Sequence, residues 1–102
     1  MQIFDLKTTR CPEAMIYVRR ALSSAISDNF KGDLQLRTIE QSMKRDLPYY
    51  LAQLEHSDVK LISAITSPLE ESVKERWLED AEAIEDDLLN IDEQIIFNIK
   101  FS

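Results

Sequence analysis

The 102-residue chain contains one cysteine, one histidine, one glycine and three prolines. One cysteine cannot form an internal disulfide, and His56, with no ligand-spaced companion, is expected at the surface and not in a metal site. The scarcity of glycine excludes a glycine-rich phosphate loop, and a single histidine gives no convincing Ser-His-Asp order. We therefore expect neither a metal nor a cofactor.

Long hydrophobic runs are also missing. The longest uninterrupted apolar stretch spans Ala14 to Val18, far short of the roughly 18 residues that a membrane span needs. Residues 1–5 lack the basic start and apolar centre of an export signal. Together with the lone cysteine, these absences predict a cytoplasmic protein with no membrane contact. A content of 44% hydrophobic and 30% charged residues indicates a single globular domain over residues 1–102.

The net charge of −7 is unevenly distributed along the chain. Residues 69–93 hold eleven acidic and two basic side chains, a balance of −9, which leaves ten basic and eight acidic side chains, or +2, elsewhere. The acidity is therefore local, and the rest of the surface is compatible with an anionic partner. We expect no direct binding of DNA.

Hydrophobic periodicity predicts four strands that alternate with three helices. The predicted strands cover residues 2–6, 34–39, 59–65 and 93–101, and a turn is expected at residues 31–33 around the only glycine. This order predicts an α+β fold: a two-layer α/β sandwich, βαβαβ(α)β, with a four-stranded mixed sheet and an additional acidic helix before the last strand. On the final strand, one face carries Ile95, Phe97, Ile99 and Phe101.

The prolines set the predicted helix starts. Pro12 suits the first position of the first helix, where its missing N–H costs nothing. Pro48 favours Asp46 as the cap of the second helix, because proline is tolerated only in a first turn. The run Ser67-Pro68-Leu69-Glu70 matches a capping box and starts a third helix about 30 Å long. The apolar face of the first helix is formed by Met15, Val18, Leu22, Ala25 and Ile26.

The third predicted helix belongs to an acidic segment, residues 67–92, which we interpret as a helical insertion within the domain. A narrow apolar stripe runs along it, formed by Leu69, Val73, Trp77, Ala81, Ile84 and Leu88. This stripe either packs within the chain or forms the seam of a homodimer. The acidic side is either a solvated face over part of the sheet or a docking element for a basic partner.

The candidate chemical site is the run Arg10-Cys11-Pro12-Glu13, between the first strand and the first helix. A thiolate is the reactive form of cysteine, and a helix N-terminus with a nearby cation favours it. We expect Cys11 at the cap position, with Arg10, and Lys7 behind it, adding positive charge. Glu13 opposes the thiolate but suits the first helical turn. From these residues alone, a reactive thiol and a buried, inert one are equally good interpretations.

Four parts of the chain together resemble the TusA/SirA family of small sulfur-carrier proteins. They are Asp5, the run Arg10-Cys11-Pro12-Glu13, the helix with Arg19-Arg20 and Leu22, and the string Arg45-Asp46-Leu47-Pro48. The resemblance covers most of residues 2–65 and the final strand. It departs from the family pattern at Thr8, where the family usually has glycine, and at Ala14, which replaces the second proline of Cys-Pro-x-Pro.

The resemblance implies that Cys11 carries sulfur as a persulfide, supported by Arg10, Pro12 and Glu13. It implies a donor such as a cysteine desulfurase and an acceptor sulfurtransferase, with tRNA involved only indirectly, through tRNA thiolation or other sulfur metabolism. Two alternatives stay open: a non-catalytic interaction domain that works through its acidic helix, and a redox sensor that dimerises through Cys11.

Two further pairs of side chains have more than one interpretation. Arg19 and Arg20 either steer an anionic partner or form the solvated side of an amphipathic helix. Tyr49 and Tyr50 offer a stacking surface, but we expect one of the two in the core.

Overall fold

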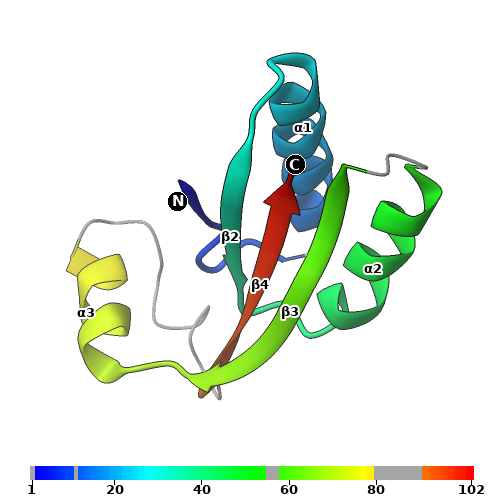
Figure 1. The fold of residues 1–102 in the computed structure, drawn as a ribbon. Coiled ribbons are helices and arrows are strands. Elements are labelled where there is room, and N and C mark those ends of the chain that lie inside the picture. The colour runs from blue at the N-terminus through cyan, green and yellow to red at the C-terminus, as the bar shows by residue number, and fades with distance from the viewer. Residues whose placement is uncertain (1, 11, 55–57, 80–90) are drawn as a thin grey trace.

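The computed structural model describes residues 2–10, 12–54, 58–79 and 91–102. Its elements are β1 (Gln2–Asp5), α1 (Glu13–Ser27), β2 (Gly32–Thr38), α2 (Met43–Gln53), β3 (Val59–Pro68), α3 (Glu71–Glu79) and β4 (Glu93–Phe101). The predicted α+β class is confirmed: α1 and α2 form one layer against a four-stranded mixed sheet, and α3 precedes the last strand (Figure 1).

The sheet has the strand order β1-β2-β4-β3. β1 runs parallel to β2, whereas β4 is antiparallel to both β2 and β3. The last strand in the sequence therefore lies between two earlier ones, as the red arrow in Figure 1 shows. Because β1 and β2 are parallel, their carboxyl ends lie at the same edge of the sheet, and so do the loops that follow them.

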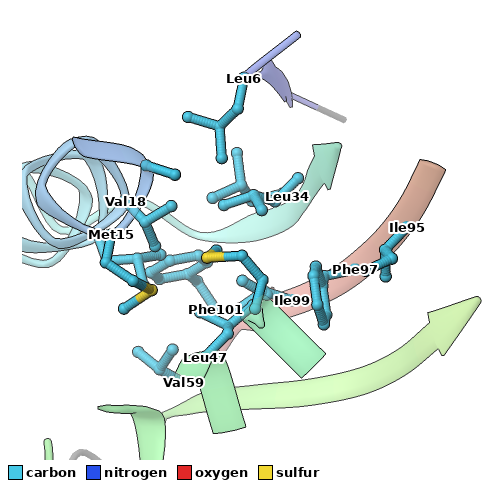
Figure 2. Close-up of a cluster of buried hydrophobic side chains, with 14 residues drawn as sticks. Leu6, Met15, Val18, Leu34, Leu47, Val59, Ile95, Phe97, Ile99 and Phe101 are labelled. Carbon is cyan, nitrogen blue, oxygen red and sulfur yellow. The ribbon is translucent and has the colours of Figure 1, made fainter. Parts of the chain in front are cut away.

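One hydrophobic core lies between the sheet and the two helices. Met15, Val18 and Leu22 of α1 are buried in it, as the periodicity predicts, while Ala25 and Ile26 are half-buried against it. Figure 2 shows side chains of α1 and β4 converging in the space between helix and sheet. The four alternating residues predicted for the last strand are all buried: Ile95, Phe97, Ile99 and Phe101. Each such apolar side chain contributes about 1.5–3 kcal/mol through removal from water.

The predicted turn at residues 31–33 is wrong. Gly32 already belongs to β2 and pairs with Phe101, and the chain reverses earlier, at Asn29, which has a left-handed φ of 57°. The N–H of Phe30 donates to the carbonyl of Ala25 at 2.8 Å, and the N–H of Asn29 donates to that of Ile26 at 3.1 Å. This is a Schellman motif, in which asparagine substitutes for the usual glycine because it tolerates the left-handed region.

The predicted start of the second helix is also wrong. α2 begins at Met43 with Ser42 as its N-cap, four residues before the predicted cap Asp46, and Pro48 lies inside the helix. The early start buries Met43 and Leu47, one turn apart, in the core. Proline at this position removes a hydrogen bond to the carbonyl of Lys44, a residue exposed to water. Burial of two core side chains outweighs that loss.

The Ser67-Pro68 pair does not start a helix. Both residues extend the third strand, which is longer than predicted, and pair with Gln94 and Glu93 of β4. β3 is an edge strand, where proline is tolerated at the end because no further ladder bond is needed. α3 begins at Glu71 and is described to Glu79, so Ala81, Ile84 and Leu88 of the predicted stripe lie outside the described residues.

Within the four described ranges, we find no helix long and apolar enough to cross a membrane.

Replacing Leu22 by alanine tests the packing of α1 on the sheet. Leu22 is fully buried, so Leu22→Ala is expected to lower the free energy of unfolding by about 2–5 kcal/mol, through lost burial and a residual cavity. Urea denaturation measures this. Ile62, with 59% of its surface exposed, is the matched control, and Ile62→Ala is expected to cost under about 1 kcal/mol. Equal losses in both variants would contradict the described core.

Candidate functional site

The loop from β1 to α1 is shaped by the side chain of Asp5. The N–H of Leu6 continues the ladder to the carbonyl of Arg37 at 2.8 Å, and the N–H of Lys7 then donates to Asp5 Oδ1 at 3.0 Å. Lys7 has a left-handed φ of 52°. The residue with positive φ is thus Lys7, not Thr8, so threonine at the position of the family's glycine is not strained by its backbone conformation.

The first turn of α1 uses the backbone of Arg10. The N–H of Ala14 donates to the Arg10 carbonyl at 2.9 Å, a bond that a proline at position 14 could not make. The helix begins at Glu13 with Pro12 as N-cap, one residue later than predicted. Pro12 nevertheless has helical torsion angles, φ −82° and ψ −14°, because its ring restricts φ. Pro12 makes no side-chain cap hydrogen bond, and Glu13 is exposed in the first turn of the helix.

Cys11, the predicted reactive residue, lies outside the described residues, and so does the cap position predicted for it. Its two covalent neighbours, Arg10 and Pro12, are described. Arg10 lies in the loop that follows β1, and Pro12 is the N-cap of α1.

Arg10 forms an ion pair across two loops. Its Nε donates to Oε2 of Glu40, which follows β2. The carboxylate also has a partner close to it in the sequence, because the hydroxyl of Ser42 donates to Glu40 Oε1 at 2.9 Å. The N–H of Glu40 donates to Oγ1 of the buried Thr38 at 3.0 Å. The side chain of Glu40 is 13% exposed and that of Arg10 is 52% exposed, so a fixed carboxylate orients a half-exposed cation.

Glu40 and Ser42 are not among the site residues predicted from the sequence. The parallel order of the first two strands is a signal that their loops meet, but the sequence alone does not distinguish Glu40 from other acidic residues such as Asp46. Asp46 pairs instead with its neighbour Arg45, at 3.0 Å and at the surface.

A cavity of about 260 Å³ adjoins the ion pair. It is lined by Arg10, by Ile39 and Gln41 of the β2–α2 loop, and by Ile91, Asp92 and Glu93 at the start of β4. The end of the acidic segment therefore forms one wall of the cavity beside Arg10, and the acidic residues Asp92 and Glu93 belong to that wall.

A separate groove of about 540 Å³ lies between α1 and α2 and begins at Pro12. The guanidinium carbon of Arg19 lies 5.6 Å from the ring centre of Tyr50, a cation–π contact. Tyr50 is half-buried and packs against the core without belonging to its buried set, whereas Tyr49 is 66% exposed. Arg20 is exposed on α1.

α3 packs through a second, smaller apolar cluster. Ile39, Leu69 and Trp77 are its buried members, and Val73, Leu78 and Ile91 pack against them. Trp77 is 3% exposed, so the described part of the predicted stripe packs within the chain. A homodimer through this stripe stays a prediction, because the remainder of the stripe lies outside the described residues.

The absence of a metal site was a further expectation. Over residues 2–10, 12–54, 58–79 and 91–102, no group of three or more histidine, cysteine, aspartate and glutamate side chains could hold a metal ion. His56 lies outside these ranges.

Comparison with protein-family models, curated proteins and solved structures gives no match to this chain. The fold and the contacts at the carboxyl edge of β1 and β2 are therefore the observations from which a function is argued.

The packing of α3 predicts the fluorescence of the only tryptophan. Because Trp77 is buried against Leu69 and Ile39, its emission is expected to be blue-shifted and protected from acrylamide quenching. Leu69→Ala opens this cluster and should shift the emission to the red. Val59→Ala, which removes a buried side chain from the main core, is the control and should leave the emission unchanged. A red-shifted, readily quenched spectrum of the unmodified protein would contradict the packing.

Proposed function

We propose that this protein is a sulfur carrier that holds a persulfide on Cys11. The observation that carries the proposal is the ion-paired Arg10, the residue before Cys11, at the junction of β1 and α1. It adds to the Arg10-Cys11-Pro12-Glu13 motif and to the agreement between the predicted and observed fold class.

Two sources of positive charge favour an anionic sulfur at this junction. The first is the N-terminus of α1, where Pro12 makes no side-chain cap hydrogen bond. The positive end of the helix dipole at this position attracts an anion. The Arg10 guanidinium is the second source. Both stabilise a thiolate relative to a thiol, and they stabilise the charged form of a persulfide in the same way.

The proposed reaction moves one sulfur atom in two displacements. The Cys11 thiolate attacks the outer sulfur of a donor persulfide, which forms a new S–S bond on Cys11 and breaks the donor's S–S bond. The donor leaves as a thiolate. An acceptor thiolate then attacks the outer sulfur of the Cys11 persulfide, takes that sulfur and releases Cys11 as a thiolate. No external oxidant or reductant is consumed.

The donor and acceptor are proposed to be proteins, a cysteine desulfurase and a sulfurtransferase, in the cytoplasm. The α1–α2 groove, which begins at Pro12, offers a surface for such a partner beside the cysteine. tRNA enters this scheme only as the final target of an acceptor enzyme.

Sulfur loading tests this proposal. Incubation of the reduced protein with a cysteine desulfurase and cysteine is expected to increase its intact mass by one sulfur atom, and dithiothreitol should remove the addition. Cys11→Ala is the matched control and should gain no sulfur. No addition to the unmodified protein, or equal addition to both proteins, would overturn the proposal.

A second candidate function, a non-catalytic interaction domain, is favoured by one observation on α3. Its apolar side is buried on Ile39, which leaves Glu71, Glu75 and Glu79 exposed. This function predicts that replacing these three residues by glutamine abolishes binding of a basic protein such as lysozyme, while Cys11→Ala has no effect. Titration in a salt series measures the binding. Binding that survives all three substitutions would reject the acidic helix as the working surface.

A further inference from the structure

The sheet has two edge strands, and they differ in length. The strand order makes β1 and β3 the outermost strands (Figure 1). β1 has four residues, whereas β3 has ten. An edge strand presents backbone N–H and C=O groups that can pair with a further strand, and a very short edge is a poor template for such pairing. β3 is therefore the edge that offers the longer template for an added strand.

Features that discourage strand pairing lie towards the two ends of β3. Lys60 is charged and exposed near the start, a bulge interrupts the ladder between Leu61 and Ser63, and Pro68 ends the strand. The five residues between the bulge and the proline contain no charge and no proline. We call this segment, residues 63–67, the open stretch of β3; its sequence is Ser63-Ala64-Ile65-Thr66-Ser67.

The open stretch is accessible to water. Ala64, Ile65 and Thr66 are exposed in succession, whereas a strand with one covered face alternates between buried and exposed residues. Within the part of the chain that the structure describes, no backbone hydrogen bond from outside the strands reaches residues 59–67. Alternate residues of an antiparallel strand direct their N–H and C=O groups away from its partner. On the side away from β4, these groups are therefore available to another strand.

The sequence of the open stretch is complementary to itself in the antiparallel direction. When Ile65 lies opposite Ile65 of a second copy, Ser63 lies opposite Ser67 and Ala64 lies opposite Thr66. This register pairs two β-branched apolar side chains at the centre and two serine hydroxyls on either side, and both are favourable cross-strand combinations. It also removes from water an isoleucine side chain that is 54% exposed.

Charged residues at the two ends of β3 favour the same register. Near the start, Lys60 lies opposite Lys100 of β4, and both are exposed, with Asp58 as a single acidic neighbour. Near the other end, Glu70 and Glu93 are exposed. Lys60 precedes Ile65 by five positions and Glu70 follows it by five, so this register places them opposite each other. Antiparallel pairing thus brings the basic start of each strand to the acidic end of the other.

We propose that β3 pairs in the antiparallel direction with β3 of a second copy of this chain, about a twofold axis at Ile65. The two four-stranded sheets then form one sheet of eight strands, by the strand addition that exposed edges support. The contact uses the same surface on both copies, so it closes at a dimer. It involves neither Cys11 nor the apolar stripe of the acidic segment, and it is independent of the proposed function.

Analytical ultracentrifugation of the full chain in a concentration series, with a reducing agent present, measures the dissociation constant of the dimer. Ile65→Lys places two like charges opposite each other at the axis and is expected to raise this constant by about tenfold or more. Ile3→Lys is the matched control, because Ile3 is 56% exposed on the other edge strand, and it should leave the constant unchanged. Circular dichroism confirms that both variants are folded.

Disulfide trapping tests the register without disturbing the edge by a charge. Opposite residues of antiparallel strands have Cα atoms about 4.5–5.5 Å apart, within the range of a disulfide. In a Cys11→Ala background, Ile65→Cys is expected to give a covalent dimer on mild oxidation with copper phenanthroline. Ile3→Cys in the same background is the control and should remain monomeric on a non-reducing gel.

A charge reversal tests the contacts at the strand ends. Lys60→Glu is expected to raise the dissociation constant by about threefold or more, because it places like charges opposite each other twice in one dimer. Adding Glu70→Lys exchanges the two charges and should restore the original constant.

A chain that is monomeric throughout the concentration series would overturn the inference, and so would a dimer that Ile65→Lys and Ile3→Lys weaken equally. A dimer that forms no disulfide through Ile65→Cys would overturn the register. A monomer that binds an extended segment of another protein at this edge would exclude the second copy as the occupant. Dimerisation of Cys11→Ala to the same extent as the unmodified chain is expected whether or not sulfur loading succeeds.

Discussion

The parallel pairing of β1 with β2 is the constraint on which the candidate site depends. Parallel strands end at the same edge of a sheet, so the β1–α1 loop and the β2–α2 loop lie side by side. Arg10 comes from the first loop and Glu40 from the second, although thirty residues separate them in the sequence. An antiparallel pairing would put these loops at opposite edges and remove the contact that orients the arginine.

The core and this edge contribute very different amounts to the free energy of unfolding. Stability comes from burial between the sheet and the two helices, where β4 contributes one face of alternating apolar side chains. The Arg10–Glu40 pair lies outside that core, where a partly exposed ion pair is worth about 1 kcal/mol or less. Substitutions at this edge are therefore expected to change the free energy of unfolding only slightly, so residues there can be selected for a chemical role.

The strands and the α1 face could be predicted from the sequence because their pattern repeats every two residues or every helical turn. Ile95, Phe97, Ile99 and Phe101 occupy every second position of β4, and all four are buried. The helix starts were harder to predict. Proline rules placed the start of α2 at Asp46, but burial of Met43 outweighs the lost hydrogen bond at Pro48. The same rules predict Pro68 at the start of a helix. In the structure Pro68 instead ends β3, where it pairs with Glu93 at an open edge of the sheet.

The candidate site could be predicted only in part, for a different reason. A cysteine between a strand and a helix is visible in the sequence, and so is an adjacent arginine. The residue that orients the arginine is not visible, since Glu40 is one of nineteen acidic residues and follows no motif. Glu40 can be identified only once the position of the β2–α2 loop and the hydrogen bond from the Ser42 hydroxyl are known.

The positions of α3 and β4 show where part of the acidic segment lies in the fold. α3 covers Ile39 with Leu69 and Trp77, and the residues before and at the start of β4 bring Asp92 and Glu93 to the cavity beside Arg10. The acidic segment thus adjoins the candidate site, so the excess negative charge borders the edge where Arg10 lies.

The most direct test of the account follows radiolabelled sulfur from cysteine, through a desulfurase, onto this chain and off again to an acceptor thiol. The account predicts that the purified, labelled protein passes its label to the acceptor in one step and that Cys11→Ala neither takes up nor passes label. Label that stays on the chain in the presence of acceptor, or that appears equally on Cys11→Ala, would contradict a carrier function at this edge of the sheet.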